Sequence, residues 1–364
     1  MINTELKNII QNMKLDGILI TDPFSLRYFT GFCGGEGTAL CTGGEAILYV
    51  DSRYTEAAKQ DISDAASGFR VVEFNRENPL YTLLRKQIGV EDGLSDPAGF
   101  RIGFEDRSMV CSTFSKLHQE LKVKLVPLED SLTIPRQIKT KEELDDLRRA
   151  EAIGDMAFSG ILNVLKPGIT ELEVAAELEY AMKKNGASGL SFDTIVASGI
   201  HSSMPHAVPT DKKLENGDFV TMDFGCIYHG YCSDMTRTVV IGKADEEQRK
   251  IYRTVLEAQQ LAMEQLRPGM KCNAVDRIAR DHIREAGYGE YFGHGLGHSV
   301  GLYIHESPAL NTRDETILCP GMIETIEPGI YVPGFGGVRI EDMGVVTEAG
   351  YESFTNSPRN LIEI

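Results

Sequence analysis

The sequence predicts two domains: an α/β domain over residues 1–131 and a larger α+β domain over residues 132–364 that is built from two pseudo-symmetric halves. Three observations predict this organisation. Short β-branched runs alternate with helical stretches in the first third of the chain. A helix-start signal follows a charged, proline-containing stretch near residue 140. Beyond it, one helical pattern recurs with an offset of 101 residues.

The first domain carries five short apolar runs that we expect to form strands, and four stretches that we expect to form helices. The strand runs are 17–21, 46–50, 70–74, 101–105 and 123–127. The helical stretches lie near 3–13, 52–60, 78–89 and 112–122. Because alternation of strands and helices is typical of α/β domains, we expect a sheet that is partly parallel.

The second domain is expected to open with a long helix, because Thr140 and Glu143 have the spacing of a capping box. Residues 165–169 and 266–270 then each carry a Pro-Gly break and open a helical stretch. These stretches end at Gly186 and Gly287, so the offset is 101 residues at both ends. A chance match of helix and turn signals is one explanation. Duplication of a half-domain is the other, and it would form a cleft between the halves.

Composition excludes several classes of protein. The net charge of −17 argues against a nucleic-acid partner or an anionic membrane surface, because binding phosphate requires a basic surface. No run of apolar residues is long enough to cross a membrane, and the start lacks the apolar region of a secretory signal. The seven cysteines form no CxxC pair. We therefore expect a reduced, cytoplasmic protein.

Two aspartates are expected on a β-hairpin. Asp223 ends an alternating run, and Asp234 precedes a β-branched run. A turn around 228–230 would place these carboxylates on adjacent strands. There the like charges would repel by about 1 kcal/mol or more, depending on the local dielectric, and a bound cation would remove this cost. Taken alone, the pair could equally be two solvated aspartates at a strand edge.

His298 lies in a glycine-rich stretch, residues 293–301, together with His294. The spacing of these two histidines would suit a helical zinc site, but the glycines make a helix unfavourable and no HExxH motif occurs. An irregular loop allows backbone and imidazoles to approach a ligand closely. Three histidines within twelve residues, the third being His305, favour a site over a structural role.

Glu327 and Glu341 lie in short apolar runs that resemble strands. A carboxylate among apolar residues is costly unless it is paired or bound to a metal. Arg339 is expected on the same strand face as Glu341, so an Arg339–Glu341 ion pair is the alternative to a metal site. In either case Arg339 is expected to contact the substrate or the ligand residues.

Together, Asp223, Asp234, His298, Glu327 and Glu341 form an oxygen-rich set with one nitrogen. A single tetrahedral zinc takes mostly nitrogen or sulfur ligands, and an imidazole is a poor calcium ligand. Two hard divalent cations that share bridging carboxylates suit this set better, which predicts hydrolysis by a metal-held water.

Taken in order, these segments resemble the pita-bread metallopeptidases, the family of methionine aminopeptidase, aminopeptidase P and prolidase, over at least residues 140–355. The resemblance implies a pita-bread fold with two divalent metal ions, usually Mn²⁺ or Co²⁺, while Zn²⁺ and Fe²⁺ also tolerate these ligands. It implies that Asp223 chelates one metal, that Asp234 and Glu341 bridge both, and that His298 and Glu327 complete the second.

The same resemblance assigns catalytic roles. Residues 202–209 match the family's substrate-contacting histidine at His206, and His294 and His305 match its other two active-site histidines. Glu327 is expected to transfer the proton, and His206 and His305 to hold the substrate or stabilise the tetrahedral intermediate. His294 is expected to line the pocket. The sequence assigns no role to His201.

Within the family, the separate N-terminal domain and Arg339 resemble the proline-specific members. Residues 28–32 and 50–54 further resemble the N-terminal domain of aminopeptidase P. We therefore expect a Xaa-Pro aminopeptidase that acts on short peptides with proline at the second position. A Xaa-Pro dipeptidase (prolidase) is the alternative, and a non-catalytic binding protein of the same fold is the alternative from another class. The resemblance also suggests a homodimer.

Overall fold

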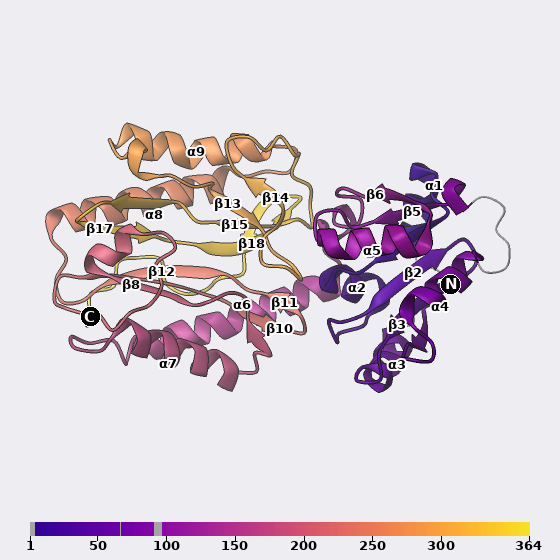
Figure 1. Ribbon diagram of the computed structural model, residues 1–364. Coiled ribbons are helices and arrows are strands. Elements are labelled where there is room, and N and C mark those ends of the chain that lie inside the picture. The colour runs from indigo at the N-terminus through magenta and orange to yellow at the C-terminus, as the bar shows by residue number, and fades with distance from the viewer. Residues whose placement is uncertain (1–3, 66, 91–96) are drawn as a thin grey trace. The chain divides into compact units, whose positions relative to one another are not determined.

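The computed structural model describes residues 4–65, 67–90 and 97–364 (Figure 1). Asn3, the first residue of the helix expected near 3–13, lies outside these residues. The chain divides into two compact units, Met1–Arg136 and Gln137–Ile364. The division lies five residues after the boundary that we expected between 131 and 132.

The first unit contains a mixed sheet. Its strands are β1 (Gly17–Ile20), β2 (Thr38–Thr42), β3 (Ala46–Val50), β4 (Arg70–Glu73), β5 (Arg101–Phe104) and β6 (Lys124–Pro127). In the described residues their order is β4-β3-β2-β1-β5-β6. Three neighbouring pairs are parallel, and the pairs β1–β2 and β2–β3 are antiparallel. The expectation of a partly parallel sheet is confirmed.

Helices cover both faces of this sheet. Ile18 and Ile20 on β1 pack on one side with the helices α1 (Thr4–Met13), α2 (Pro23–Thr30) and α3 (Thr55–Ala65). Leu19, between them, packs on the other side with α4 (Leu80–Ile88) and α5 (Cys111–Leu121). We had not expected α2 or β2. The Asp22 side chain caps α2 by accepting from the backbone N–H groups of Phe24 and Ser25, a signal that the sequence offered at Asp-Pro.

The second unit carries four long helices and several small sheets in its described residues. The helices are α6 (Lys141–Ile161), α7 (Glu171–Lys184), α8 (Glu246–Gln265) and α9 (Cys272–Glu285). The expected capping box of Thr140 and Glu143 starts α6. The strands are β7 (Gly189–Leu190), β8 (Ile195–Ser198), β9 (Phe219–Phe224), β10 (Cys226–Tyr228), β11 (Tyr231–Cys232), β12 (Met235–Val240), β13 (Gly297–Ser299), β14 (Glu306–Leu310), β15 (Ile323–Ile326), β16 (Gly329–Val332), β17 (Gly336–Arg339), β18 (Asp342–Thr347) and β19 (Gly350–Ser353).

Short 3-10 turns complete the two units: η1 (Pro97–Gly99), η2 (Ile134–Arg136), η3 (Gly199–Ser203) and η4 (Gly289–Tyr291). Among the described residues, none of the helices combines the length and the apolar character that crossing a bilayer requires.

The second unit repeats its architecture. The helix α7 and the helix α9 begin and end 101 residues apart, and each packs against the helix before it, α6 and α8. Each is preceded by the same backbone contact, from Gly168 N–H to Leu214 O and from Gly269 N–H to Leu318 O. Antiparallel pairs follow in both halves, β9 with β12 and β15 with β18. The prediction of two pseudo-symmetric halves is confirmed.

In the first half of the unit, α6 and α7 pack against one face of the strands. Met222 and Phe224 on β9 pack in the core formed with α6 and α7, whereas Asp223 between them faces the opposite side. This alternation leaves the face of the strands away from the helices free to carry polar residues. The candidate active site is built on that face.

Candidate active site

The two aspartates lie on the expected hairpin. β9 pairs with β12 in antiparallel register, with Asp223 opposite Thr236, and Asp234 immediately precedes β12. Between them β10 and β11 close a tight turn at His229 and Gly230, both of which have positive φ. Both aspartates line one cavity of about 510 Å³.

His298 lies on β13, a short strand that pairs with β14. The expectation that this segment is not helical is confirmed, but the expectation of an irregular loop is wrong for Gly297–Ser299. Gly297 explains how the strand fits: a Cβ there would lie 1.9 Å from the carbonyl oxygen of Thr325. Only glycine therefore lets β13 pass close enough to β15 to bring His298 to the cavity.

The two glutamates lie at strand ends. Glu327 directly follows β15, and Glu341 lies between β17 and β18. The Thr236 hydroxyl donates to Glu341 Oε2 at 2.7 Å. The Thr325 hydroxyl donates to Glu327 Oε1 at 3.3 Å and accepts from the His298 backbone N–H at 3.1 Å. Neighbouring threonines thus orient both carboxylates.

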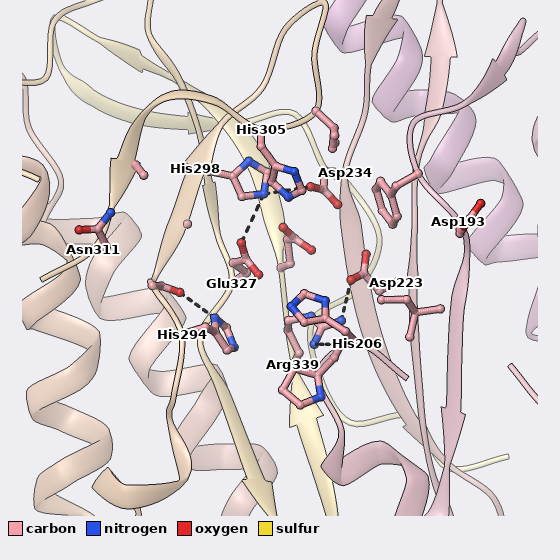
Figure 2. A pocket seen from close by; sticks show the side chains of 18 of the residues that line it. Asp193, His206, Asp223, Asp234, His294, His298, His305, Asn311, Glu327 and Arg339 are labelled. Carbon is pink, nitrogen blue, oxygen red and sulfur yellow. Dashed lines mark hydrogen bonds and ion pairs between the residues drawn. The ribbon is translucent and has the colours of Figure 1, made fainter. Parts of the chain in front are cut away.

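The five predicted ligand residues converge in the cavity (Figure 2). His298 Nε2 lies 3.4 Å from Asp234 Oδ2 and 3.5 Å from Glu327 Oε1. Ligand atoms of Asp234, His298 and Glu341 all lie within 4.8 Å of one another. Asp223 Oδ1 and Glu341 Oε1 are buried and have no hydrogen-bond partner among the described residues. Buried acceptors without donors, grouped around one imidazole, fit the binding of divalent cations.

The electrostatics of the cluster point the same way. Burial raises the pKa of the Asp234 and Glu341 carboxyls well above their ordinary values, and the neighbouring carboxylates raise these pKa values further. The pKa of Glu327 is also raised, chiefly by burial. Because such groups resist being charged together, positive charge is needed to hold all of them as carboxylates.

Arg339 does not make the ion pair with Glu341 that we considered. Its Nη2 donates to Asp223 Oδ2 at 2.6 Å, and its Nε donates to the Thr236 hydroxyl at 3.0 Å. Arg339 and Glu341 nevertheless face the same way, as expected: both line the cavity, whereas Ile340 between them packs in the core. Both also bond the Thr236 hydroxyl, although β17 ends at Arg339 and Glu341 lies before β18.

Arg339 also connects the cluster to His294. Its Nη1 donates to the Tyr331 hydroxyl at 2.8 Å, which lies 2.9 Å from His294 Nε2. His294 Nδ1 lies 2.7 Å from the carbonyl oxygen of Gly295, so Nδ1 carries the proton and Nε2 accepts from Tyr331. Burial, and next the Arg339 charge, lower the pKa of His294 to about 4. His294 is therefore neutral at physiological pH.

His206 and His305 lie at the more exposed side of the cavity. The ring of His305 lies 4.5 Å from that of His298, centroid to centroid. Burial, followed by the nearby His298, lowers the pKa of His305. The carbonyl oxygen of Pro205, the residue before His206, accepts from Arg339 Nη1 at 3.3 Å, and Figure 2 draws His206 in the region of Arg339 and Asp223. His201, by contrast, does not line the cavity.

Several residues at the site had not been singled out from the sequence. Tyr331, Thr236 and Thr325 orient the predicted residues, and the cavity is also lined by Phe192, Asp193, Ile195, Asn311 and Arg313. Tyr331 stands in the run Glu-Pro-Gly-Ile-Tyr directly after Glu327, so proximity in sequence could have indicated it. The charged residues Asp193 and Arg313 have no local signal in the sequence.

The fold and the acid–imidazole cluster define a metal-dependent hydrolase with a separate α/β domain. The model of metallopeptidase family M24 matches residues 145–348, and that of the creatinase/prolidase N-terminal domain matches residues 4–138. The chain belongs to metallopeptidase family M24. Membership implies that divalent metal ions serve the reaction.

Full-length relatives resemble this chain closely. A Xaa-Pro dipeptidase of Pyrococcus furiosus is 42% identical over 361 residues, which cover 98% of each chain. The solved structure of a Xaa-Pro dipeptidase from Bacillus anthracis has a TM-score of 0.92 at 41% identity, covering 99% of this chain and 98% of that one. An X-Pro aminopeptidase from Thermotoga maritima has a TM-score of 0.88 at 35% identity, covering 98% and 100%.

Proposed function

We propose that the protein is a Xaa-Pro dipeptidase, which hydrolyses the bond between an N-terminal residue and a following C-terminal proline. The observation that carries this proposal is the converging cluster of carboxylates and imidazoles, in a chain that matches Xaa-Pro dipeptidases over its whole length. Both peptidase classes among the relatives share the reaction, so the remaining question is the length of the substrate.

The sequence alone led us to favour an aminopeptidase, and the relatives favour the dipeptidase alternative. The preference for an aminopeptidase rests on the resemblance of residues 28–32 and 50–54 to the N-terminal domain of aminopeptidase P. Because relatives described as dipeptidases match this chain over 98% of their length, that domain is common to both classes and does not distinguish them. Substrate length has to be argued from the cavity.

We propose that Asp223, Asp234, His298, Glu327 and Glu341 hold two divalent cations, Mn²⁺ or Co²⁺ being the first candidates. The orphaned oxygens of Asp223 and Glu341 support this assignment. When bound, the cations would polarise the scissile carbonyl and lower the pKa of a water molecule.

The protein's own residues have separable roles in this proposal. Glu327 is held by Thr325 with its carboxylate turned toward His298, and it is suited to accept and return a proton. His206 and His305 are exposed to an entering peptide and can donate to its carbonyl. Both ring nitrogens of His294 bond protein groups, Nδ1 the Gly295 carbonyl and Nε2 the Tyr331 hydroxyl. His294 therefore orients Tyr331 and Arg339 and transfers no proton.

The charges around the cavity fit a short zwitterionic peptide. Asp193 and Arg313 both line the cavity and are largely exposed, and within the described residues no side-chain hydrogen bond or ion pair is recorded for either. Asp193 comes from the first half of the unit and Arg313 from the second. In Figure 2, Asp193 and Asn311 lie on opposite sides of the cluster, and Asn311 is two residues from Arg313 in the chain. We propose that Asp193 receives the substrate's amino group and Arg313 the carboxylate of its proline.

The test compares Ala-Pro, Ala-Pro-Ala and Ala-Pro amide with metal-loaded protein. We expect cleavage of Ala-Pro and little cleavage of the other two, because the carboxylate of a dipeptide lies next to the scissile bond. Arg313→Ala is expected to raise KM for Ala-Pro about tenfold or more, since it removes a hydrogen bond to a charged group. Arg253→Ala, an exposed change on α8 outside the cavity, is the control.

Cleavage of Ala-Pro-Ala at a rate similar to that of Ala-Pro would favour the aminopeptidase. An unchanged KM for Ala-Pro in Arg313→Ala would refute the role of Arg313 while leaving the dipeptidase activity in place. Absence of cleavage of all three peptides would contradict the proposed function itself.

A further inference from the structure

His206 stands on a segment that has little regular structure of its own. Between η3 and β9, residues 204–212 form neither helix nor strand. Among the described residues no hydrogen-bond partner is recorded for the His206 imidazole, and the side chain is largely exposed. The place of this ring in the cavity is therefore set by what holds the backbone on either side of it.

One buried carboxylate holds both sides. Glu171, the first residue of α7, is fully buried, and its Oε1 accepts from the Ser198 backbone N–H and hydroxyl, both at 2.7 Å. Its Oε2 accepts from the backbone N–H of Thr210 at 3.0 Å and from its hydroxyl at 2.7 Å. His201 Nδ1 lies 3.1 Å from Oε1. Ser198 and His201 precede His206, and Thr210 follows it.

These bonds keep the carboxylate charged. Burial would raise the pKa of Glu171, but the hydrogen bonds from Thr210, Ser198 and His201 together hold that pKa below its ordinary value. A buried charge is unfavourable unless it is hydrogen-bonded, and within the described residues the side-chain bonds of Glu171 all come from Ser198, His201 and Thr210. The segment and the carboxylate therefore depend on each other.

The second half of the unit shows what the helix start itself requires. At the same position, 101 residues later, α9 begins with Cys272, which is also fully buried. The backbone contacts correspond: Glu171 N–H donates to Lys212 O, and Cys272 N–H donates to Thr316 O. Because the motif forms without a glutamate at this position, the Glu171 carboxylate is not needed to start the helix.

We propose that Glu171 is a positioning residue that acts through His206. By fixing Ser198 and Thr210 to one carboxylate, it holds the segment between them and so presents His206 to the substrate. His201 belongs to the same clamp, which gives this histidine a role outside the cavity. The proposal rests on the role of His206 in the proposed peptidase activity.

A double-mutant cycle with Ala-Pro as substrate tests this proposal. Glu171→Gln keeps the size of the side chain but replaces one carboxylate oxygen by an NH₂ group. This group is a donor, so it cannot accept from the N–H and hydroxyl groups that the oxygen binds. It is expected to lower kcat/KM by about 10- to 100-fold, because a displaced catalytic group costs that much. In the background of His206→Ala, the same change is expected to lower kcat/KM by less than about twofold further. Metal content is expected to stay unchanged in all variants.

Glu173→Ala is the matched control. Glu173 lies two residues further along α7, and among the described residues its side chain bonds to Thr170, as part of the helix cap. This change is expected to lower Tm but to preserve kcat/KM. Hydrogen exchange gives a second readout: amides of residues 199–209 are expected to exchange faster in Glu171→Gln and not in Glu173→Ala. If Glu171→Gln fails to fold, Ser198→Ala and Thr210→Val, which each remove one hydroxyl donor, replace it in the cycle.

The outcomes separate the two proposals. Additive losses from Glu171→Gln and His206→Ala would overturn the positioning role, because the two residues would then act independently. A His206→Ala variant with full activity would instead refute the catalytic assignment of His206 within the proposed function.

Discussion

At the scale of single residues, the site is dominated by charges removed from water. Asp234 and Glu341 are almost completely buried, and Arg339 is the cation that contacts the cluster directly, through Asp223. One guanidinium cannot neutralise four carboxylates. The carboxylates of the cluster therefore need bound cations to stay charged together. Replacing each residue in turn tests its contribution to binding these cations.

Asp234 and His294 are expected to behave differently when replaced. Asp234→Ala is expected to abolish activity and to lose about two metals per chain, because this carboxylate is the proposed bridge. His294→Ala is expected to lower turnover but to retain metal, because Tyr331 and Gly295 occupy both of its ring nitrogens. Elemental analysis alongside kcat checks both. Full metal content in Asp234→Ala, or a metal-free His294→Ala, would contradict these assignments.

Glu151 predicts a pH dependence of stability. This residue on α6 is fully buried behind the site, where the Thr355 hydroxyl donates to it at 2.6 Å. Burial, and then Asp155 and Asp342, raise its pKa from 4.5 to about 8. The folded state thus holds a proton that the unfolded state releases above pH 4.5. The stability that comes from this proton is fully present at low pH and is lost as pH rises toward 8.

Glu151→Gln removes this proton linkage. The variant is expected to gain stability relative to the parent protein between pH 5 and pH 8, with a slope of at most about 1.4 kcal/mol per pH unit. Urea unfolding followed by circular dichroism, with metal removed from both proteins by a chelator, measures the difference. A difference that stays constant with pH would show that Glu151 is ionised in the folded state.

At the scale of elements, the helix starts are the features that the sequence specifies most directly. Thr140 Oγ1 accepts from the Glu143 backbone N–H, and Glu143 Oε2 accepts from the Thr140 N–H at 2.7 Å. Both partners lie within one turn, so their spacing in the sequence is sufficient to predict the contact. The same box recurs at Thr170 and at Asp245, before α7 and α8.

Removing the Thr140 cap of α6 should change the free energy of unfolding by an amount typical of helix caps. Thr140→Ala is expected to lower the free energy of unfolding by about 1 kcal/mol, because one backbone N–H at the start of α6 loses its acceptor. Thr140→Ser keeps the oxygen and is expected to be nearly neutral. Urea unfolding of the three proteins compares them. Equal losses from both substitutions would mean that the methyl group, and not the cap, stabilises this end of the helix.

Strands were predicted less completely than helix starts. β1, β3, β4, β5 and β6 appear within a residue or so of the expected runs. Strands that the sequence did not predict include β2, β7, β8, β13, β14 and β19. The register between strands has no local signal at all. For this reason the sequence indicated Arg339 and Asp223 separately but not their ion pair, which joins residues 116 positions apart. Thr236 was missed for the same reason, because its hydrogen bond to Glu341 joins residues 105 positions apart.

At the scale of the whole molecule, motif spacing predicted the two-domain fold, and it singled out the residues that converge in the cavity. It did not predict substrate length, because Asp193 and Arg313, which we propose to bind the two ends of the substrate, are isolated charges in the sequence that line one cavity only in the folded unit. Contacts within one helical turn can be predicted from the spacing of residues in the sequence. Contacts between distant parts of the fold cannot.

The similar spacing of the two halves extends to the acids of the site. Glu327 follows Asp223 by 104 residues and Glu341 follows Asp234 by 107, so each half contributes a pair of acids from corresponding strands. Duplication and fusion of a half-length ancestral gene would leave this pattern, with two identical copies once facing each other through four carboxylates. His298 breaks the symmetry, since 101 residues earlier the corresponding strand carries Ala197. The imidazole is therefore the member of the site that has no counterpart in the other half, whereas the four acids are divided evenly between the halves.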